Sequence, residues 1–399
     1  MPDHRANTAP FAIALALSLG AAISLGMSRF SYALLLAPMR ADLGWTYLLA
    51  GAMNTANALG YLIGALATPA LMRRFGAQKL LVGGALLTAF FMLLSGLVID
   101  AGLLLVQRTL AGVASALIFV AGGVLAARLG SLHPSRAGFL IGIYYSGTGL
   151  GIVLSALLVP ATQSLAGGAP HAWQWAWLAL GAACLLATAA MVAPAQRIDG
   201  RAAPASVHDR FAWRDFRFGL AGYFMFGVGY IGYMTFVVAL LREQGMSAGL
   251  ITAFYIVLGL AVMASSRIWA RLLDYFRGGQ SMAILNGLLA LATILPALTA
   301  QPVLIFFSGA LFGGVFLSVV ASTTALVRHN AAAAAWTGGI GAFTTVFAFG
   351  QIVGPSVVGW IADGAGGLQR GLIFSALALL VGALLASRQP ALARPQVAL

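Results

Sequence analysis

The stretch PAQRIDGRAAPASVHDRFAWRDF, residues 194–216, is the longest polar interruption in an otherwise apolar chain of 399 residues. It is rich in Arg, Asp, Ala and Pro, whereas long apolar runs dominate the sequence on both sides of it. An α-helix needs about 20 apolar residues to cross the hydrocarbon core of a bilayer. By this criterion we predict six spans before the stretch and six after it: 11–37, 48–71, 78–98, 102–127, 137–160 and 172–193, then 217–241, 249–272, 280–300, 302–327, 335–361 and 370–388.

The equal number of spans on each side predicts two repeated halves. We therefore expect an all-α integral membrane fold, in which twelve transmembrane helices form two pseudo-symmetric six-helix bundles. The N-terminal bundle would comprise residues 1–193, the cytoplasmic central loop residues 194–216, and the C-terminal bundle residues 217–399.

The composition agrees with a membrane protein. The chain is 61% hydrophobic and 8% charged, whereas about 25% of the residues of a soluble domain are charged. The net charge of +13 does not require nucleic acid as a partner, because basic residues of membrane proteins gather on the cytoplasmic side. A single cysteine, Cys184, excludes internal disulfides, and no Cys/His cluster predicts a metal site.

The distribution of Lys and Arg predicts the orientation. With the N-terminus in the cytoplasm, sixteen of the 22 basic residues fall in cytoplasmic segments. Three more, Arg40, Arg242 and Arg370, fall in outer loops. Because basic residues are retained on the cytoplasmic side, this bias predicts that both termini are cytoplasmic.

Two equivalent loops carry further motifs. The loop between spans 2 and 3 reads PALMRRFGAQK, residues 69–79, and the loop between spans 8 and 9 reads WARLLDYFRGGQ, residues 269–280. The fourth span contains QRTLAGVASA, residues 107–116. Together with twelve spans and a basic central loop, these motifs resemble the major facilitator superfamily, although Pro69 and Arg73 replace the usual Gly and Asp of the first loop.

Two other segments narrow the resemblance. The segments GMSRFSYALLLAPMRADLGW, residues 26–45, and GYFMFGVGYIGYMTF, residues 222–236, are similar to the bacterial YbfB/YjiJ-type transporters. This resemblance implies a multi-pass secondary transporter of the bacterial inner membrane that works by alternating access without a cofactor. It implies conformational roles for the loop residues and for a bend in span 11: Arg74, Gly76, Arg271 and Asp274, with Gly354 and Pro355. We expect the Asp274 carboxylate to contact basic residues or a helix N-terminus.

Arg29 is the sole charge in AISLGMSRFSYALLLAPM, residues 22–39. An arginine near the middle of a span costs about 2.5–3.5 kcal/mol on insertion scales, which suggests a function. On a regular helical wheel Arg29 shares an arc with Ser24, Ser28, Ser31 and Tyr32. A polar arc in a membrane helix faces protein or water, so we expect it to line a central cavity.

No acidic residue is available to neutralise Arg29. All nine acids fall in loops or at span ends: Asp3, Asp42, Asp100, Asp199, Asp209, Asp215, Glu243, Asp274 and Asp363. Arg108, in span 4, lies at a similar predicted depth, either as a second anion contact or as a structural link between helices. Arg267 lies near the inner end of span 8, where its side chain can reach the interface. An anionic substrate would supply the counter-ion for Arg29.

Other polar residues in the spans could complete the site. Asn54 and Asn57 lie three residues apart on span 2, hence on one helix face. Tyrosines would add hydroxyl donors, although aromatic residues in membrane helices serve more often in packing. The further substrate-binding candidates are Tyr32, Tyr144, Tyr230 and Tyr233.

These features predict a monomeric transporter in the lipid bilayer for a small organic solute, anionic and carboxylate-like. The alternative is an exporter of drugs or amino-acid-like metabolites from the same superfamily. An intramembrane enzyme or a non-transporting receptor is more remote. The spans contain no histidine or carboxylate that could act as an acid or base, so we predict no catalytic residue.

Overall fold

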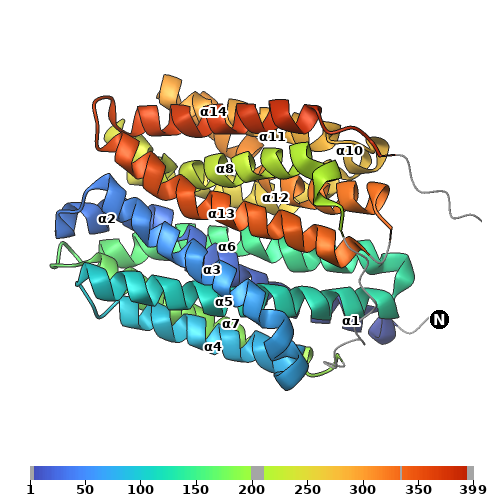
Figure 1. Cartoon of the computed structure of the whole chain (residues 1–399). Coiled ribbons are helices and arrows are strands. Elements are labelled where there is room, and N and C mark those ends of the chain that lie inside the picture. The colour runs from blue at the N-terminus through green and yellow to red at the C-terminus, as the bar shows by residue number, and fades with distance from the viewer. Residues whose placement is uncertain (1–3, 199–210, 333–334, 393–399) are drawn as a thin grey trace, which may run out of the picture.

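The computed structural model describes residues 4–198, 211–332 and 335–392. Within these ranges every regular element is a helix, and twelve helices are long and apolar enough to cross a membrane. Six precede the central connection and six follow it, as predicted (Figure 1). The twelve-span prediction is therefore confirmed, with shifts of several residues at some ends.

The first span is not a regular α-helix, and here the helical wheel was wrong. It consists of α1 (His4–Ala21), a π-helical segment η1 (Ala22–Phe30) and α2 (Tyr32–Leu43). The Ser31 amide donates to the Gly26 carbonyl five residues back, at 3.1 Å. A π-helix turns less per residue than an α-helix, so a regular wheel does not describe how Ser24, Ser28, Arg29, Ser31 and Tyr32 are arranged around the span.

A close approach between two glycines accompanies the π segment. A Cβ atom on Gly26 would lie 2.5 Å from the Cα of Gly151, in the fifth span. Only glycine permits this distance, because any other side chain would overlap the neighbouring backbone. The two glycines thus bring the first and fifth spans into direct backbone contact, as small residues do in membrane helices.

The remaining helices of the N-terminal half are α3 (Tyr47–Phe75), α4 (Ala77–Ser95), α5 (Ala101–Leu132), α6 (Ala137–Leu165) and α7 (Trp173–Ala195). The C-terminal half contains α8 (Arg217–Glu243), α9 (Ala248–Ile268), the short α10 (Ala270–Tyr275), α11 (Gln280–Leu298), α12 (Pro302–Asn330), α13 (Trp336–Ala362) and α14 (Gly367–Ser387). Short 3₁₀ turns, Pro134–Arg136 and Trp213–Phe216, precede α6 and α8.

Polar side chains at helix starts explain several span boundaries. The Asp100 carboxylate accepts from the Leu103 amide at 2.8 Å at the start of α5, and Thr46 accepts from Leu49 at the start of α3. Such N-caps satisfy amides that have no partner within the helix.

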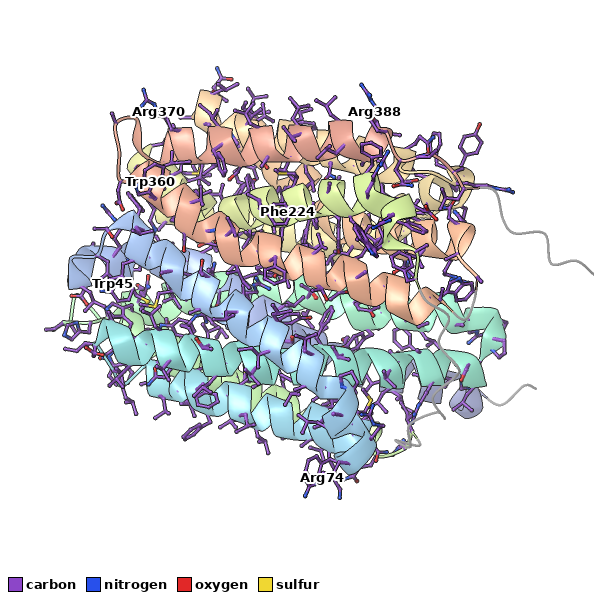
Figure 2. All side chains as sticks on the ribbon, in the orientation of Figure 1. Trp45, Arg74, Phe224, Trp360, Arg370 and Arg388 are labelled. Carbon is purple, nitrogen blue, oxygen red and sulfur yellow. The ribbon has the colours of Figure 1, made fainter. Side chains whose placement is uncertain are left out.

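The first and last spanning helices mark one end of the molecule. α1 begins and α14 ends at the same end, which we call the central-loop face, and the other end is the opposite face (Figure 1). Arg74 and Arg388 lie at the central-loop face, whereas Trp45, Trp360 and Arg370 lie at the opposite face (Figure 2). This placement agrees with the predicted alternation of the spans.

The two halves meet along three helix pairs: α3 with α13, α6 with α9, and α2 with α8. Thr55 on α3 donates to the Ile352 carbonyl on α13 at 2.9 Å. A Cβ atom on Gly51 would lie 2.3 Å from the Pro355 carbonyl oxygen, so these helices are in backbone contact. From there α3 and α13 diverge toward the central-loop face (Figure 1).

Candidate functional site

Arg29 lies at the end of η1 and is 2% exposed. Its Nη2 donates to Oε1 of Gln351 on α13 at 2.8 Å. Its Cζ lies 5.8 Å from the centre of the Tyr61 ring on α3. Arg29 Nε has no hydrogen-bond partner among the described residues. The guanidinium is therefore buried beside neutral groups and retains a free donor.

Gln351 connects Arg29 to a third helix. Its Nε2 donates to the hydroxyl of Tyr230 on α8 at 2.6 Å, and the side chain is 2% exposed. The chain of hydrogen bonds from Arg29 through Gln351 to Tyr230 crosses the interface between the two halves. Gln351 was not among the residues predicted from the sequence, although a lone amide within the apolar eleventh span was a usable signal.

Arg108 on α5 has more partners than Arg29. Its Nη1 donates to the Ser28 carbonyl at 2.7 Å and its Nη2 to Asn54 Oδ1 at 3.2 Å. Its Cζ lies 5.2 Å from the Tyr32 ring centre and 5.4 Å from that of Trp177. These contacts link η1, α3, α5 and α7 within the N-terminal half.

The two predicted asparagines contact α5, and Asn54 also reaches the other half. Asn54 Nδ2 donates to the Thr235 hydroxyl on α8 at 2.8 Å, while Asn57 Nδ2 donates to the Arg108 carbonyl at 3.1 Å. The Tyr32 hydroxyl donates to the Ala50 carbonyl at 2.8 Å. Asn54 and Asn57 thus do share the face predicted for them.

The remaining predicted tyrosines separate into two groups. Tyr230 bonds Gln351 and so belongs to the Arg29 network, the chain of hydrogen bonds formed by Arg29, Gln351 and Tyr230. Tyr144 donates to the Phe119 carbonyl at 2.8 Å, and the Tyr233 hydroxyl lies 2.7 Å from that of Ser308. Tyr144 and Tyr233 therefore bond within their own halves, and their hydroxyls are not directed at Arg29.

Among the described residues, no carboxylate lies within ion-pair distance of Arg29 or Arg108. Asp42, near the end of α2, instead accepts from Trp173 Nε1 at 2.5 Å and lies 2.6 Å from His171 Nδ1. The described part of the chain also contains no group of three or more His, Cys, Asp or Glu that could hold a metal ion.

The residues predicted to act in the conformational change lie at two places. Gly76 (φ +85°) ends α3 at the central-loop face, beside the exposed Arg74. Arg271 and Asp274 are exposed on α10. The basic partner expected for Asp274 is not found among the described residues, because α10 is a separate short helix that leaves this side chain in the open.

Gly354 and Pro355 lie where α13 packs against its neighbours. A Cβ atom on Gly354 would lie 2.6 Å from the Val228 carbonyl oxygen on α8, and Pro355 faces Gly51 on α3. α13 continues as one helix through both residues. Their position is thus at the contact between α13, α8 and α3, near the opposite face.

Asp363 also links the halves, at the opposite face. Its carboxylate accepts from the amides of Tyr47 at 2.7 Å and Leu48 at 2.8 Å, the first residues of α3. The Tyr47 hydroxyl donates to Glu243 on α8, and Arg40 Cζ lies 3.7 Å from the Tyr47 ring centre. A carboxylate at a helix N-terminus is favourable because it satisfies free amides and interacts with the helix dipole.

Comparison with solved structures identifies the same fold elsewhere. A bacterial homologue of the human lysosomal transporter Spinster, inward-facing and unoccupied, aligns with a TM-score of 0.72 at 13% identity, over 97% of this chain and 97% of that chain. A point mutant of the nucleoside transporter NupG aligns with a TM-score of 0.72 at 14% identity, over 95% of this chain and 99% of that one. At these identities the likeness shows the fold alone.

The family comparison covers most of the chain. The family model described as "Uncharacterised MFS-type transporter YbfB" matches residues 21–387. Among curated proteins, none matches this sequence. The family consists of transporters and not enzymes, so the twelve apolar helices belong to a multi-pass membrane protein that carries out secondary transport. The chain belongs to the YbfB-type family of the major facilitator superfamily.

Proposed function

We propose that this protein moves a small organic anion across a bacterial inner membrane by alternating access, with both termini in the cytoplasm. Arg29 is the anion-binding residue. The observation that carries the proposal is that Arg29 is buried with only a neutral amide as its described side-chain acceptor and with Nε free. A buried charge needs a partner of opposite sign, and a carboxylate substrate would provide one.

The contacts of Arg108 support a different role for that residue. Both of its terminal nitrogens already donate to protein oxygens, and its guanidinium lies near two aromatic rings. Its Nε has no described partner, like that of Arg29, but a substrate that used the two terminal nitrogens of Arg108 would have to displace these bonds. We therefore assign Arg108 to holding η1, α3 and α5 together, and leave anion binding to Arg29.

The links at the opposite face support alternating access. Asp363 joins α13 to the start of α3, and Glu243 joins α8 to Tyr47. These bonds close the opposite face, while α3 and α13 diverge toward the central-loop face (Figure 1). Hydrogen bonds between rigid bundles can break and reform as the bundles rock, which is what an alternating mechanism requires.

Thermal-shift measurements on the purified full-length protein test the anion proposal. Butyrate and benzoate should raise the melting temperature, whereas butyramide and benzamide, which match them in shape but carry no charge, should not. Arg29→Ala should abolish the carboxylate shift, and Arg29→Lys should weaken it because lysine lacks the planar donor fork. The control, Arg267→Ala, removes an exposed arginine of α9 and should leave the shift unchanged. Equal shifts by amides and carboxylates would refute the anion site.

A further inference from the structure

Aromatic side chains from both halves surround the Arg29 network. In the N-terminal half, the Phe119 ring lies 5.5 Å from that of Tyr145, and Tyr61 lies beside Arg29. In the C-terminal half, the Tyr230 ring lies 5.5 Å from that of Phe347. Arg29 contacts the Tyr61 ring directly and is joined to Tyr230 through Gln351.

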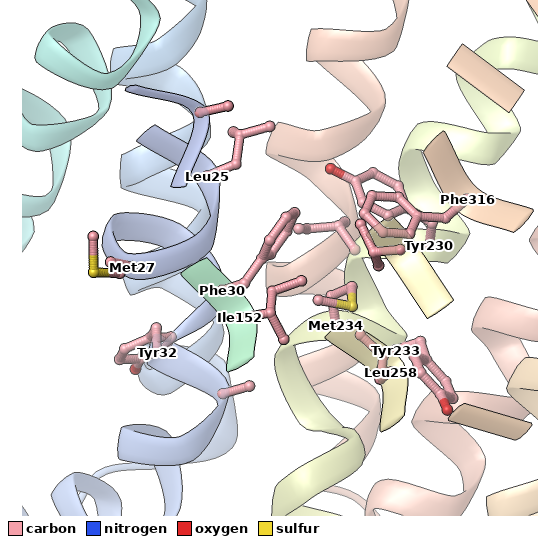
Figure 3. Packing of buried hydrophobic residues seen from close by; sticks show 14 of the residues in the cluster. Leu25, Met27, Phe30, Tyr32, Ile152, Tyr230, Tyr233, Met234, Leu258 and Phe316 are labelled. Carbon is pink, nitrogen blue, oxygen red and sulfur yellow. The ribbon is translucent and has the colours of Figure 1, made fainter. Parts of the chain in front are cut away.

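One ring of each group, Tyr61 and Tyr230, lies near the Arg29 side chain or its Gln351 partner. Tyr61 lies beside the Arg29 guanidinium, Tyr230 is joined to Arg29 through Gln351, and Tyr145 belongs to the ring group of the same half as Tyr61. These three tyrosines come from α3, α6 and α8, so rings from both halves converge on one region. Phe30, the residue after Arg29, points toward Tyr230 and Phe316 and lies 5.9 Å from the Phe316 ring centre (Figure 3).

Several of these rings are not fully covered by protein. Tyr145 is 37% exposed, and Tyr61, Phe119 and Phe347 are half-buried. By contrast, Tyr230 is 3% exposed and lies nearly parallel to Phe316, at 7°. The half-buried rings therefore have some surface left for contact with another group, and the buried rings, including Tyr230 beside Phe347, pack against them.

From this arrangement we propose that the transported anion is an aromatic carboxylate, whose flat ring packs between Tyr61, Tyr145 and Phe347 while its carboxylate binds Arg29. The proposal rests on the anion site proposed above and deepens it. Aromatic rings attract each other most strongly in offset or edge-to-face contacts at centroid distances of about 4.5–7 Å, as the rings here already do. A planar ring can adopt such contacts on both sides, whereas a saturated ring cannot.

The test compares benzoate with cyclohexanecarboxylate, which has the same charge and ring size but no flat face. Dissociation constants measured by calorimetry on the full-length protein should favour benzoate by about tenfold, the combined effect expected from two aromatic contacts. Phe347→Leu and Tyr145→Leu should each reduce this preference severalfold. The matched control is Phe349→Leu, on the same helix as Phe347 but 53% exposed, which should retain the full preference.

The outcomes separate this inference from the anion proposal. If both acids bind equally and both require Arg29, the aromatic selectivity is wrong and the anion site stands. If neither acid binds at millimolar concentration, the anion site is wrong and the aromatic selectivity falls with it. The comparison in the unmodified protein needs no variant, so a leucine variant that fails to fold does not remove the test.

Discussion

Replacing Gln351 with glutamate would give Arg29 a permanent counter-ion. Glutamate has nearly the same shape as glutamine, and it would place a carboxylate oxygen where the amide oxygen now accepts from Arg29 at 2.8 Å. If Arg29 binds the substrate carboxylate, the new side chain would compete for the same donors. Gln351→Glu should therefore abolish or greatly weaken anion binding without removing Arg29.

The magnitude follows from the distance. Two unit charges about 4 Å apart attract each other by about 4 kcal/mol at an effective dielectric constant near 20. Burial of the new carboxylate offsets part of this attraction. The remaining advantage is of the order of a hydrogen bond to a charged group, about 1.5–3 kcal/mol. Anion affinity should then fall by about 10- to 100-fold, since 1.4 kcal/mol corresponds to a factor of ten.

The assay is calorimetric binding of benzoate to the two variants Gln351→Glu and Gln351→Met. Methionine keeps the length of the side chain but removes both hydrogen bonds and adds no charge, so Arg29 stays available. We expect benzoate to bind Gln351→Met at least as tightly as the unmodified protein. Equal weakening by both variants would show that Gln351 acts through shape, and unchanged affinity in Gln351→Glu would refute the role of Arg29.

Three further predictions concern the halves and their orientation. Asp363→Asn should weaken the link to the start of α3 by about 1 kcal/mol. The population in which the opposite face is open should then rise about fivefold in spin-label distance measurements. Asp100→Asn alters a cap within one half and should leave these distances unchanged. Gly51→Ala should separate α3 from α13 with little loss of thermal stability, but Gly60→Ala should lower the melting temperature, because its Cβ would lie 1.8 Å from the Thr109 carbonyl oxygen within the N-terminal half. Reporter fusions after residues 44, 168 and 245 should report the outside, and those after 76, 133 and 205 the cytoplasm; one inverted junction would contradict the orientation.

The number of spans was predictable because it depends on a local quantity, the length of each apolar run. The residues at which the spans end were less predictable. We ended the first span at residue 37, before Pro38, yet α2 continues through Pro38 to Leu43. Proline within a membrane helix is tolerated where neighbouring helices accommodate it. The helix ends instead at Gly44, whose φ of +66° is a conformation that glycine adopts readily.

The site was only partly predictable. Arg29 could be singled out because a charge in an apolar run is locally visible. The acceptor of Arg29 could not be predicted, because Gln351 lies 322 residues away and meets Arg29 only when the two halves pack together. The π-helical backbone at Arg29 was also not predictable, since no residue type signals it and the close approach of Gly26 to Gly151 depends on tertiary packing.

The Arg29 network and the Asp363 link suggest how an anion could act on the transport cycle. The bond from Arg29 to Gln351 joins η1 to α13, so it exists only while the two halves are close at that level. If an anion binds Arg29 as proposed, it would take over this donor and free Gln351, which would change the energy of the interface between the halves. A ligand shifts a conformational equilibrium only through such a difference in affinity between states. Asp363 lies at the opposite face and contacts backbone amides, which an anion at Arg29 leaves untouched. Loss of Asp363 should therefore change the equilibrium between conformational states in the absence of anion. Loss of Gln351 should instead change how far anion binding shifts this equilibrium.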